Sequence, residues 1–178
     1  MEFKVLEKSQ WASVKEIYME AFPKQERKPF FVLKHSVKKG KVKIFVAMEG
    51  EELLGFVAAI PYKGMVMVDY LAVSSKIRSK GTGSFLMQEV CKYFQDKTIV
   101  LLIERLDEVA ENAEQRIARR RFYVKNGFTS SELFVEGEGG EMEIMNFGGK
   151  ILPSQYMDLQ QYALGEFLFK LSKMHLVK

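Results

Sequence analysis

The sequence predicts a mixed α/β protein, in which a single sheet has helices on its faces. Three strands follow one another closely, at residues 42–48, 53–60 and 65–73, and such tight connections indicate an antiparallel meander. An amphipathic helix and an uninterrupted apolar run at 99–103 come next. A strand, a crossover helix and a strand in this order predict a parallel pair with a right-handed connection, so the sheet combines both strand directions.

Hydrophobic spacing and turn residues predict the other elements. Residues 2–7 alternate as a strand does, and the apolar stripe that follows predicts a helix with Ser9 as its N-cap and Pro23 at its end. Further helices are expected at 30–38, 84–96 and 111–125, and a hairpin joins strands at 128–135 and 141–147. The predicted order is β-α-α-β-β-β-α-β-α-β-β plus a C-terminal helix.

The predicted domain comprises residues 1–147, and a linker with an amphipathic helix occupies 148–178. Gly148 and Gly149 begin the linker, and apolar residues recur at helical spacing from Tyr156 to Leu171. We expect this helix to pack on the same domain or at an interface, such as that of a homodimer.

Composition limits the classes of function. The chain has 178 residues, of which 47% are hydrophobic and 28% charged, as in an ordinary soluble domain. The net charge of +4 suits a small anionic ligand and is too low to indicate nucleic-acid binding. One cysteine excludes an internal disulfide, and His35 and His175 have no partners at metal-ligand spacing, so no metal is expected. Without a long apolar run or a signal peptide, we expect a cytoplasmic protein with no membrane partner.

The stretch between the third strand and its helix carries the strongest functional signal. It reads Arg78-Ser79-Lys80-Gly81-Thr82-Gly83-Ser84. Amides at a helix N-terminus attract anions, the basic side chains add charge, and the glycines let a phosphate approach the main chain. The NTPase phosphate loop needs its lysine after the glycine, and the dinucleotide fingerprint needs a glycine where Leu86 stands. We therefore predict a pyrophosphate site of another kind.

These residues fit the pattern Arg/Gln-x-x-Gly-x-Gly/Ala. Together with the preceding Leu71-Ala72-Val73 and the later Tyr123-Val124-Lys125-Asn126-Gly127-Phe128, the chain resembles the GNAT superfamily of N-acetyltransferases over about residues 1–147. The resemblance implies a GNAT-like fold. It also implies that the main chain of Leu71, Ala72 and Val73 binds the pantetheine arm of acetyl-CoA. The amides of Arg78, Ser79, Lys80, Gly81, Thr82, Gly83 and Ser84 would hold the pyrophosphate.

The resemblance further implies two catalytic residues. Tyr123 matches the tyrosine that protonates the CoA thiolate, with a packing role as the alternative. Glu104, at the end of the apolar strand, would relay the amine proton through water; a solvated charge is the alternative, and Asp69 is a competing base. Arg116 and Arg119 stand where family members commonly have asparagine and alanine, so the CoA contact of that asparagine does not carry over.

The predicted function is transfer of an acetyl group from acetyl-CoA to a primary amine by direct attack in a ternary complex. The acceptor is a small molecule or a peptide, bordered by the connector after the first helix, in which Glu26 would attract an amine and Arg27 a carboxylate. A CoA-binding regulatory or sensor module without transferase activity is the alternative. Nucleic-acid binding by residues 119–125 is disfavoured by the low net charge, and this basic cluster is expected to be a solvated helix face.

Overall fold

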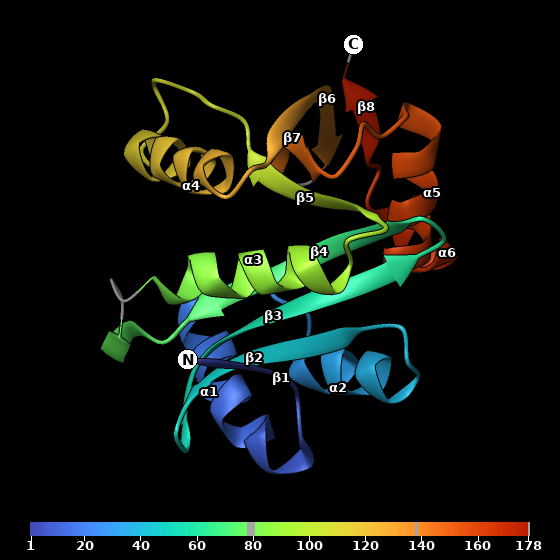
Figure 1. Ribbon diagram of the computed structural model, residues 1–178. Coiled ribbons are helices and arrows are strands. Elements are labelled where there is room, and N and C mark those ends of the chain that lie inside the picture. The colour runs from blue at the N-terminus through green and yellow to red at the C-terminus, as the bar shows by residue number, and fades with distance from the viewer. Residues whose placement is uncertain (78–80, 138, 178) are drawn as a thin grey trace. The chain divides into compact units, whose positions relative to one another are not determined.

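The computed structural model describes residues 1–77, 81–137 and 139–177 and confirms the mixed α/β fold. Within this part of the chain, the sheet has eight strands in the order β1-β2-β3-β4-β5-β7-β6-β8 (Figure 1). The strands are β1 Glu2–Val5, β2 Lys43–Glu49, β3 Glu52–Tyr62, β4 Met65–Val73, β5 Thr98–Glu104, β6 Thr129–Gly137, β7 Gly140–Phe147 and β8 His175–Val177. The helices are α1 Trp11–Ala21, α2 Phe30–Lys38, α3 Thr82–Tyr93, α4 Ala113–Lys125, α5 Pro153–Leu164 and α6 Glu166–Leu171. The chain divides into two compact units, Met1–Pro61 with Val68–Tyr93, and Tyr62–Met67 with Phe94–Lys178.

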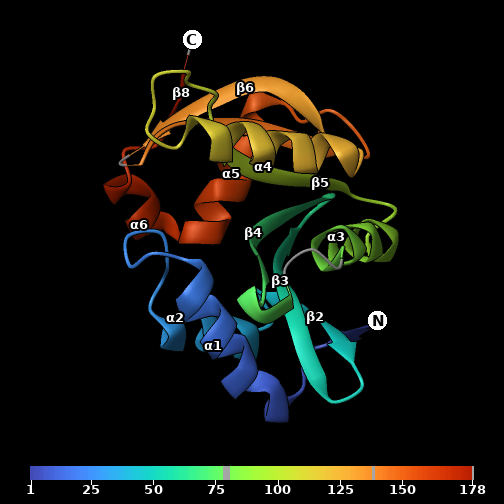
Figure 2. The ribbon, with the colours of Figure 1, turned by 90° about the vertical axis from the view of Figure 1, so that its left-hand side faces the viewer.

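The first unit contains β1 to β3, the second half of β4 and three helices. β1, β2 and β3 pair antiparallel, as predicted for the meander. Within this unit, α1 and α2 cover one face of the strands and α3 covers the other (Figure 2). The alternation of side chains in β2 and β3 explains this arrangement, because Phe45 contacts Tyr93 of α3 while Phe56 contacts Tyr18 of α1. Tyr18, Phe45 and Phe56 are all fully buried.

The second unit is built around β5, which pairs with β4 on one side and β7 on the other. Met65–Met67 of β4 lie parallel to Thr98–Val100, which confirms the predicted parallel pair. β7 runs antiparallel to both β5 and β6. Within this unit, α4 and α5 lie on opposite faces of the strands (Figure 1). β5 is therefore covered on both faces, as its continuous apolar sequence predicts.

The C-terminal segment differs from the single helix that its periodicity predicts. It forms α5 and α6, separated by Gly165, and then β8, which pairs antiparallel with β6. Gly165 has φ 82° and ψ 150°, a conformation that an α-helix cannot contain. The boundary prediction at Ser9 was also wrong, because Lys8–Gln10 form a 3-10 turn and Gln10 is the N-cap of α1. No helix in the described part of the chain is long and apolar enough to cross a membrane.

Candidate functional site

The end of β4 and the start of α3 carry most of the residues predicted to bind acetyl-CoA. Leu71 and Val73 are partly buried and Ala72 is buried in β4. Gly81 precedes α3 with φ 75°, and its carbonyl accepts a hydrogen bond from the Phe85 amide at 2.9 Å. Thr82, Gly83 and Ser84 therefore form the first turn of α3, the end of a helix that attracts anions. Arg78, Ser79 and Lys80 lie outside the described residues.

Two features of this segment favour an anion at the helix start. α3 has no acidic residue in its first turn, so nothing in that turn opposes the positive end of the helix dipole. Gly81 has a left-handed φ, which glycine adopts without strain, and it has no side chain to hinder the approach of a ligand to the main chain. The described residues are compatible with a phosphate group at this position, and the phosphate site stays a prediction.

Gly55 in β3 is a residue that the sequence reasoning missed. A Cβ atom at this position would lie 2.6 Å from the Ala72 carbonyl oxygen, 3.2 Å from the Val73 Cα atom and 3.3 Å from a Leu86 methyl carbon. Glycine thus lets β3, β4 and α3 approach closely behind the predicted pantetheine site. A glycine within a strand often marks such an approach, and this signal was present in the sequence.

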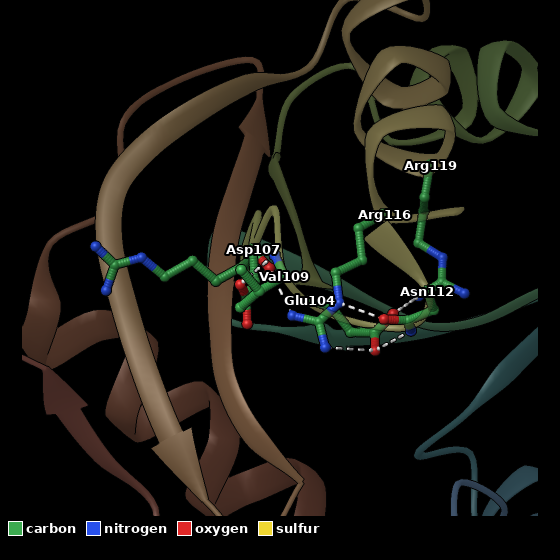
Figure 3. Close-up of polar contacts among 7 residues, drawn as sticks. Glu104, Asp107, Val109, Asn112, Arg116 and Arg119 are labelled. Atoms are coloured by element: carbon green, nitrogen blue, oxygen red, sulfur yellow. Dashed lines mark hydrogen bonds and ion pairs between the residues drawn. The ribbon is translucent and has the colours of Figure 1, made fainter. Parts of the chain in front are cut away.

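Glu104 lies at the end of β5 and is held by side chains of α4 and the loop before it (Figure 3). Asn112 Nδ2 donates to Glu104 Oε1 at 2.9 Å, and Arg119 Nη1 donates to Oε2 at 2.6 Å. Arg116 Nη2 lies 3.6 Å from Oε1, and Arg116 Nε donates to Asn112 Oδ1 at 2.7 Å. Both carboxylate oxygens therefore help to fasten α4 to β5. The solvated charge that the sequence left open as an alternative does not describe this residue.

Two of the arginines in the basic cluster of α4 form ion pairs with carboxylates of the sheet. Arg119 pairs with Glu104, and Arg120 forms a two-pronged pair with Glu143 of β7, with Nε–Oε2 at 3.0 Å and Nη2–Oε1 at 3.4 Å. Glu143 is only 4% exposed. The expectation of a solvated helix face is therefore incomplete: Arg119 is 44% exposed but also pairs with Glu104, and Arg120 is held by the buried Glu143 carboxylate.

Tyr123 lies in the last turn of α4, one helical turn after Arg119. Its ring meets those of Phe122 and Phe128 edge-on, at centroid distances of 5.1 and 5.7 Å. Burial raises the pKa of Tyr123 to about 12, against a smaller lowering by the Arg119 charge. The phenol is therefore protonated at neutral pH and can donate a hydrogen bond. Arg119 thus interacts with both predicted catalytic residues, since it pairs with Glu104 and its charge lowers the pKa of Tyr123 slightly.

The sequence of this region matches a known family. The family model described as "Acetyltransferase (GNAT) domain" matches residues 40–130, which is half of the chain and includes the β4–α3 segment and Tyr123. The chain belongs to the GNAT acetyltransferase family. No protein of curated function matches its sequence significantly.

Solved structures share the GNAT fold of this protein. A GNAT-family acetyltransferase of Bacteroides thetaiotaomicron has a TM-score of 0.73 at 21% identity, covering 95% of this chain and 98% of its own. An aminoglycoside 6'-N-acetyltransferase of Enterococcus faecium has a TM-score of 0.63 at 18% identity, covering 83% and 96%. A Bacillus subtilis acetyltransferase in complex with CoA has a TM-score of 0.62 at 15% identity, covering 85% and 99%.

Asp69, the competing candidate base of this GNAT protein, also forms an ion pair. Lys28 Nζ donates to Asp69 Oδ2 at 2.7 Å, and the Lys28 amide donates to the Tyr70 hydroxyl at 3.1 Å. The Tyr18 hydroxyl in turn donates to the Lys28 carbonyl oxygen at 2.9 Å. Burial raises the pKa of the Tyr70 hydroxyl well above its usual range, with a further contribution from the Asp69 charge. These contacts fasten the connector between α1 and α2 to β4.

Proposed function

We propose that the protein is an N-acetyltransferase that transfers an acetyl group from acetyl-CoA to a primary amine. Its membership of the GNAT family supports acyl transfer in general. The β4–α3 segment is the observation that carries the proposal, because it combines the family's strand and glycine motif with a first helical turn that contains no acidic residue. The Bacillus subtilis acetyltransferase was solved with CoA, which agrees with this cosubstrate.

The proposed chemistry is direct attack in a ternary complex. The amine nitrogen bonds to the thioester carbon, the carbon–sulfur bond breaks, and the amine loses a proton while the thiolate gains one. We assign the stabilisation of the leaving thiolate to Tyr123. Because the pKa of Tyr123 is about 12 and that of an ordinary thiol is about 8.5, its main effect would be a hydrogen bond to the developing thiolate.

We assign removal of the amine proton to Glu104, acting through water. The contacts of Glu104 make this role testable. Glu104→Gln removes the base together with its ion pairs to Arg119 and Arg116, whereas Arg119→Met removes the shorter of these pairs and keeps the carboxylate. A base predicts that kcat falls about 100-fold in the first variant and only a few-fold in the second. Equal losses in the two variants would assign Glu104 to fastening α4 and not to catalysis.

Calorimetric titration with acetyl-CoA tests the proposal as a whole. We expect saturable binding and acetylation of at least one amine in a panel of amino acids, peptides and polyamines. Binding without turnover across the panel would favour the alternative, a CoA-binding regulatory module. Absence of acetyl-CoA binding would refute both.

A further inference from the structure

A groove with a strongly basic lining lies between α1, α2 and their connector in the first unit. It has a volume of about 750 Å³. Among the described residues, its lining has five cationic side chains and no acidic one. The cations are Lys15, Lys24, Arg27, Lys28 and Lys34.

These cations differ in how they are held. Lys28 is paired with Asp69, and Arg27 donates to two main-chain carbonyl oxygens. The other three, Lys15, Lys24 and Lys34, are exposed and form no ion pair with any acid of the described chain. Their charges are therefore available to a binding partner.

Aromatic rings form the apolar part of the same lining. Trp11 and Phe30 meet edge-on at 5.6 Å, with Lys34 Nζ 5.4 Å from the Trp11 ring centroid and Lys15 Nζ 5.8 Å from that of Phe30. Phe31 also lines the groove and is 74% exposed. A partner that uses both parts of this lining needs an apolar group beside negative charge.

The segment 107–114 of the second unit, which forms the loop before α4 and the first residues of α4, has this character. It contains four acidic and no basic side chain; the acids are Asp107, Glu108, Glu111 and Glu114, and all four are exposed. None of them forms an ion pair within the part of the chain that the structure describes. Val109 lies between these acids in the sequence and is 92% exposed.

Hydrogen bonds fix the conformation of this loop. The Val109 amide donates to Asp107 Oδ1 at 3.1 Å (Figure 3), and the Ala110 amide donates to the Asp107 carbonyl oxygen at 3.3 Å. At the start of the loop, Arg116 Nη1 donates to the Arg105 carbonyl oxygen at 2.9 Å. The loop is thus ordered before it meets a partner, and an ordered loop loses less conformational entropy on binding than a flexible one.

We propose that the groove of one copy of this protein receives the segment 107–114 of a second copy. The charges are complementary, since three lysines without ion pairs meet four carboxylates without ion pairs. The exposed Val109 side chain would contact Trp11 and Phe31. Every copy carries both surfaces, so the contact requires no other molecule. It concerns assembly and does not depend on the transferase function.

Sedimentation velocity tests self-association directly. One groove and one loop form a small interface, so we expect a Kd of about 10–100 µM at about 50 mM NaCl. The contact is mainly electrostatic, so the Kd should rise about tenfold or more at about 500 mM NaCl. A sedimentation coefficient that does not change between about 2 and 200 µM protein at low salt would overturn the proposal, since a contact within one chain or with another molecule gives no such change.

Charge reversal then tests the two surfaces. Lys15→Glu with Lys34→Glu reverses charges of the groove, and Glu108→Lys with Glu111→Lys reverses charges of the loop. We expect each double variant alone to be monomeric, and an equimolar mixture of the two to associate again, because the altered groove fits the altered loop. Recovery also shows that both variants are folded. Two monomeric variants that do not associate on mixing would overturn the pairing.

A matched control separates the groove from the net charge. Lys38→Glu with Lys39→Glu makes the same change of charge at exposed positions at the end of α2, outside the groove. We expect this variant to self-associate with a Kd within about twofold of the unaltered protein. A loss of association equal to that of Lys15→Glu with Lys34→Glu would overturn the assignment to the groove.

Trp11 is the only tryptophan of the chain and lines the groove, so its fluorescence reports whether a loop enters it. The Glu108→Lys, Glu111→Lys variant supplies the groove, and a Trp11→Phe protein, which has no tryptophan, supplies the loop. We expect a saturable fluorescence change on titration, weakened about three- to tenfold when the loop protein also carries Val109→Ser. Val124→Ser, at a 48% exposed position of α4, is the control and should have no effect. Equal effects of the two serine substitutions, or no fluorescence change, would overturn the contact.

Discussion

Gly55→Ala in β3 should displace the neighbouring strand β4, which carries the predicted pantetheine site. The added methyl group would lie 2.6 Å from the Ala72 carbonyl oxygen, which is 0.4 Å inside the 3.0 Å limit that real Cβ atoms respect, and 3.2 Å from the Val73 Cα atom. Both neighbours are main-chain atoms of β4, so no rotamer change can relieve the clash. Either β3 or β4 must shift by a few tenths of an ångström.

The expected loss of stability follows from two opposing contributions. Overpacking of a well-packed core costs about 1–3 kcal/mol. Replacing glycine by alanine in an extended segment recovers about 0.5–1 kcal/mol, since the unfolded chain loses freedom. We therefore expect a net destabilisation of about 1–2 kcal/mol. Because the shift falls on Ala72 and Val73, acetyl-CoA affinity should also fall, by about tenfold.

Gly64→Ala is the matched control. Gly64 lies in the turn between β3 and β4, and a Cβ atom there would meet nothing within 4 Å. Urea denaturation gives the free energy of unfolding of both variants, and calorimetry gives their affinity for acetyl-CoA at a temperature where both are folded. We expect the control to match the unaltered protein in both measurements. A Gly55→Ala variant as stable and as tight-binding as the control would refute the close approach of β3 and β4.

Three further predictions concern the second unit and the single cysteine. Tyr123→Phe should lower kcat about 10- to 100-fold at neutral pH. Because the pKa of Tyr123 is about 12, the shape of the pH–kcat profile below about pH 11 should be the same in the variant and the unaltered protein. A variant profile that is shifted in this range would contradict the assignment. Arg120→Met should destabilise the protein by about 2–4 kcal/mol in urea denaturation, since it leaves the buried Glu143 carboxylate unpaired, whereas Arg121→Met on the exposed side should cost less than about 0.5 kcal/mol. Burial raises the pKa of the Cys91 thiol to about 11, so a thiol reagent at pH 8 should react with the folded protein many times more slowly than with the urea-unfolded chain, and similar rates would show that α3 is not packed as described.

Local patterns in the sequence predicted most of the elements correctly. The bounds of α2 and β4 agree with prediction to the residue, and those of α4 and β5 to within two residues. Apolar spacing encodes such elements because it depends on neighbours along the chain. The C-terminal segment shows the limit of this reasoning. Its periodicity continues through Gly165, but the main-chain conformation there ends the helix, and β8 forms through pairing with β6.

The candidate site likewise has features that the sequence predicts and features that only the structure shows. The sequence by itself determined the strand, the glycine turn and the tyrosine motif, since each is a contiguous pattern with its own local chemistry. Only the tertiary structure decided that Glu104 is clamped by Asn112 and Arg119, that Gly55 lies against Ala72, and that lysines of α1 and α2 share one groove. Each of these contacts joins residues from different elements. Their formation depends on which faces of those elements pack together, and a single sequence contains no local record of that choice.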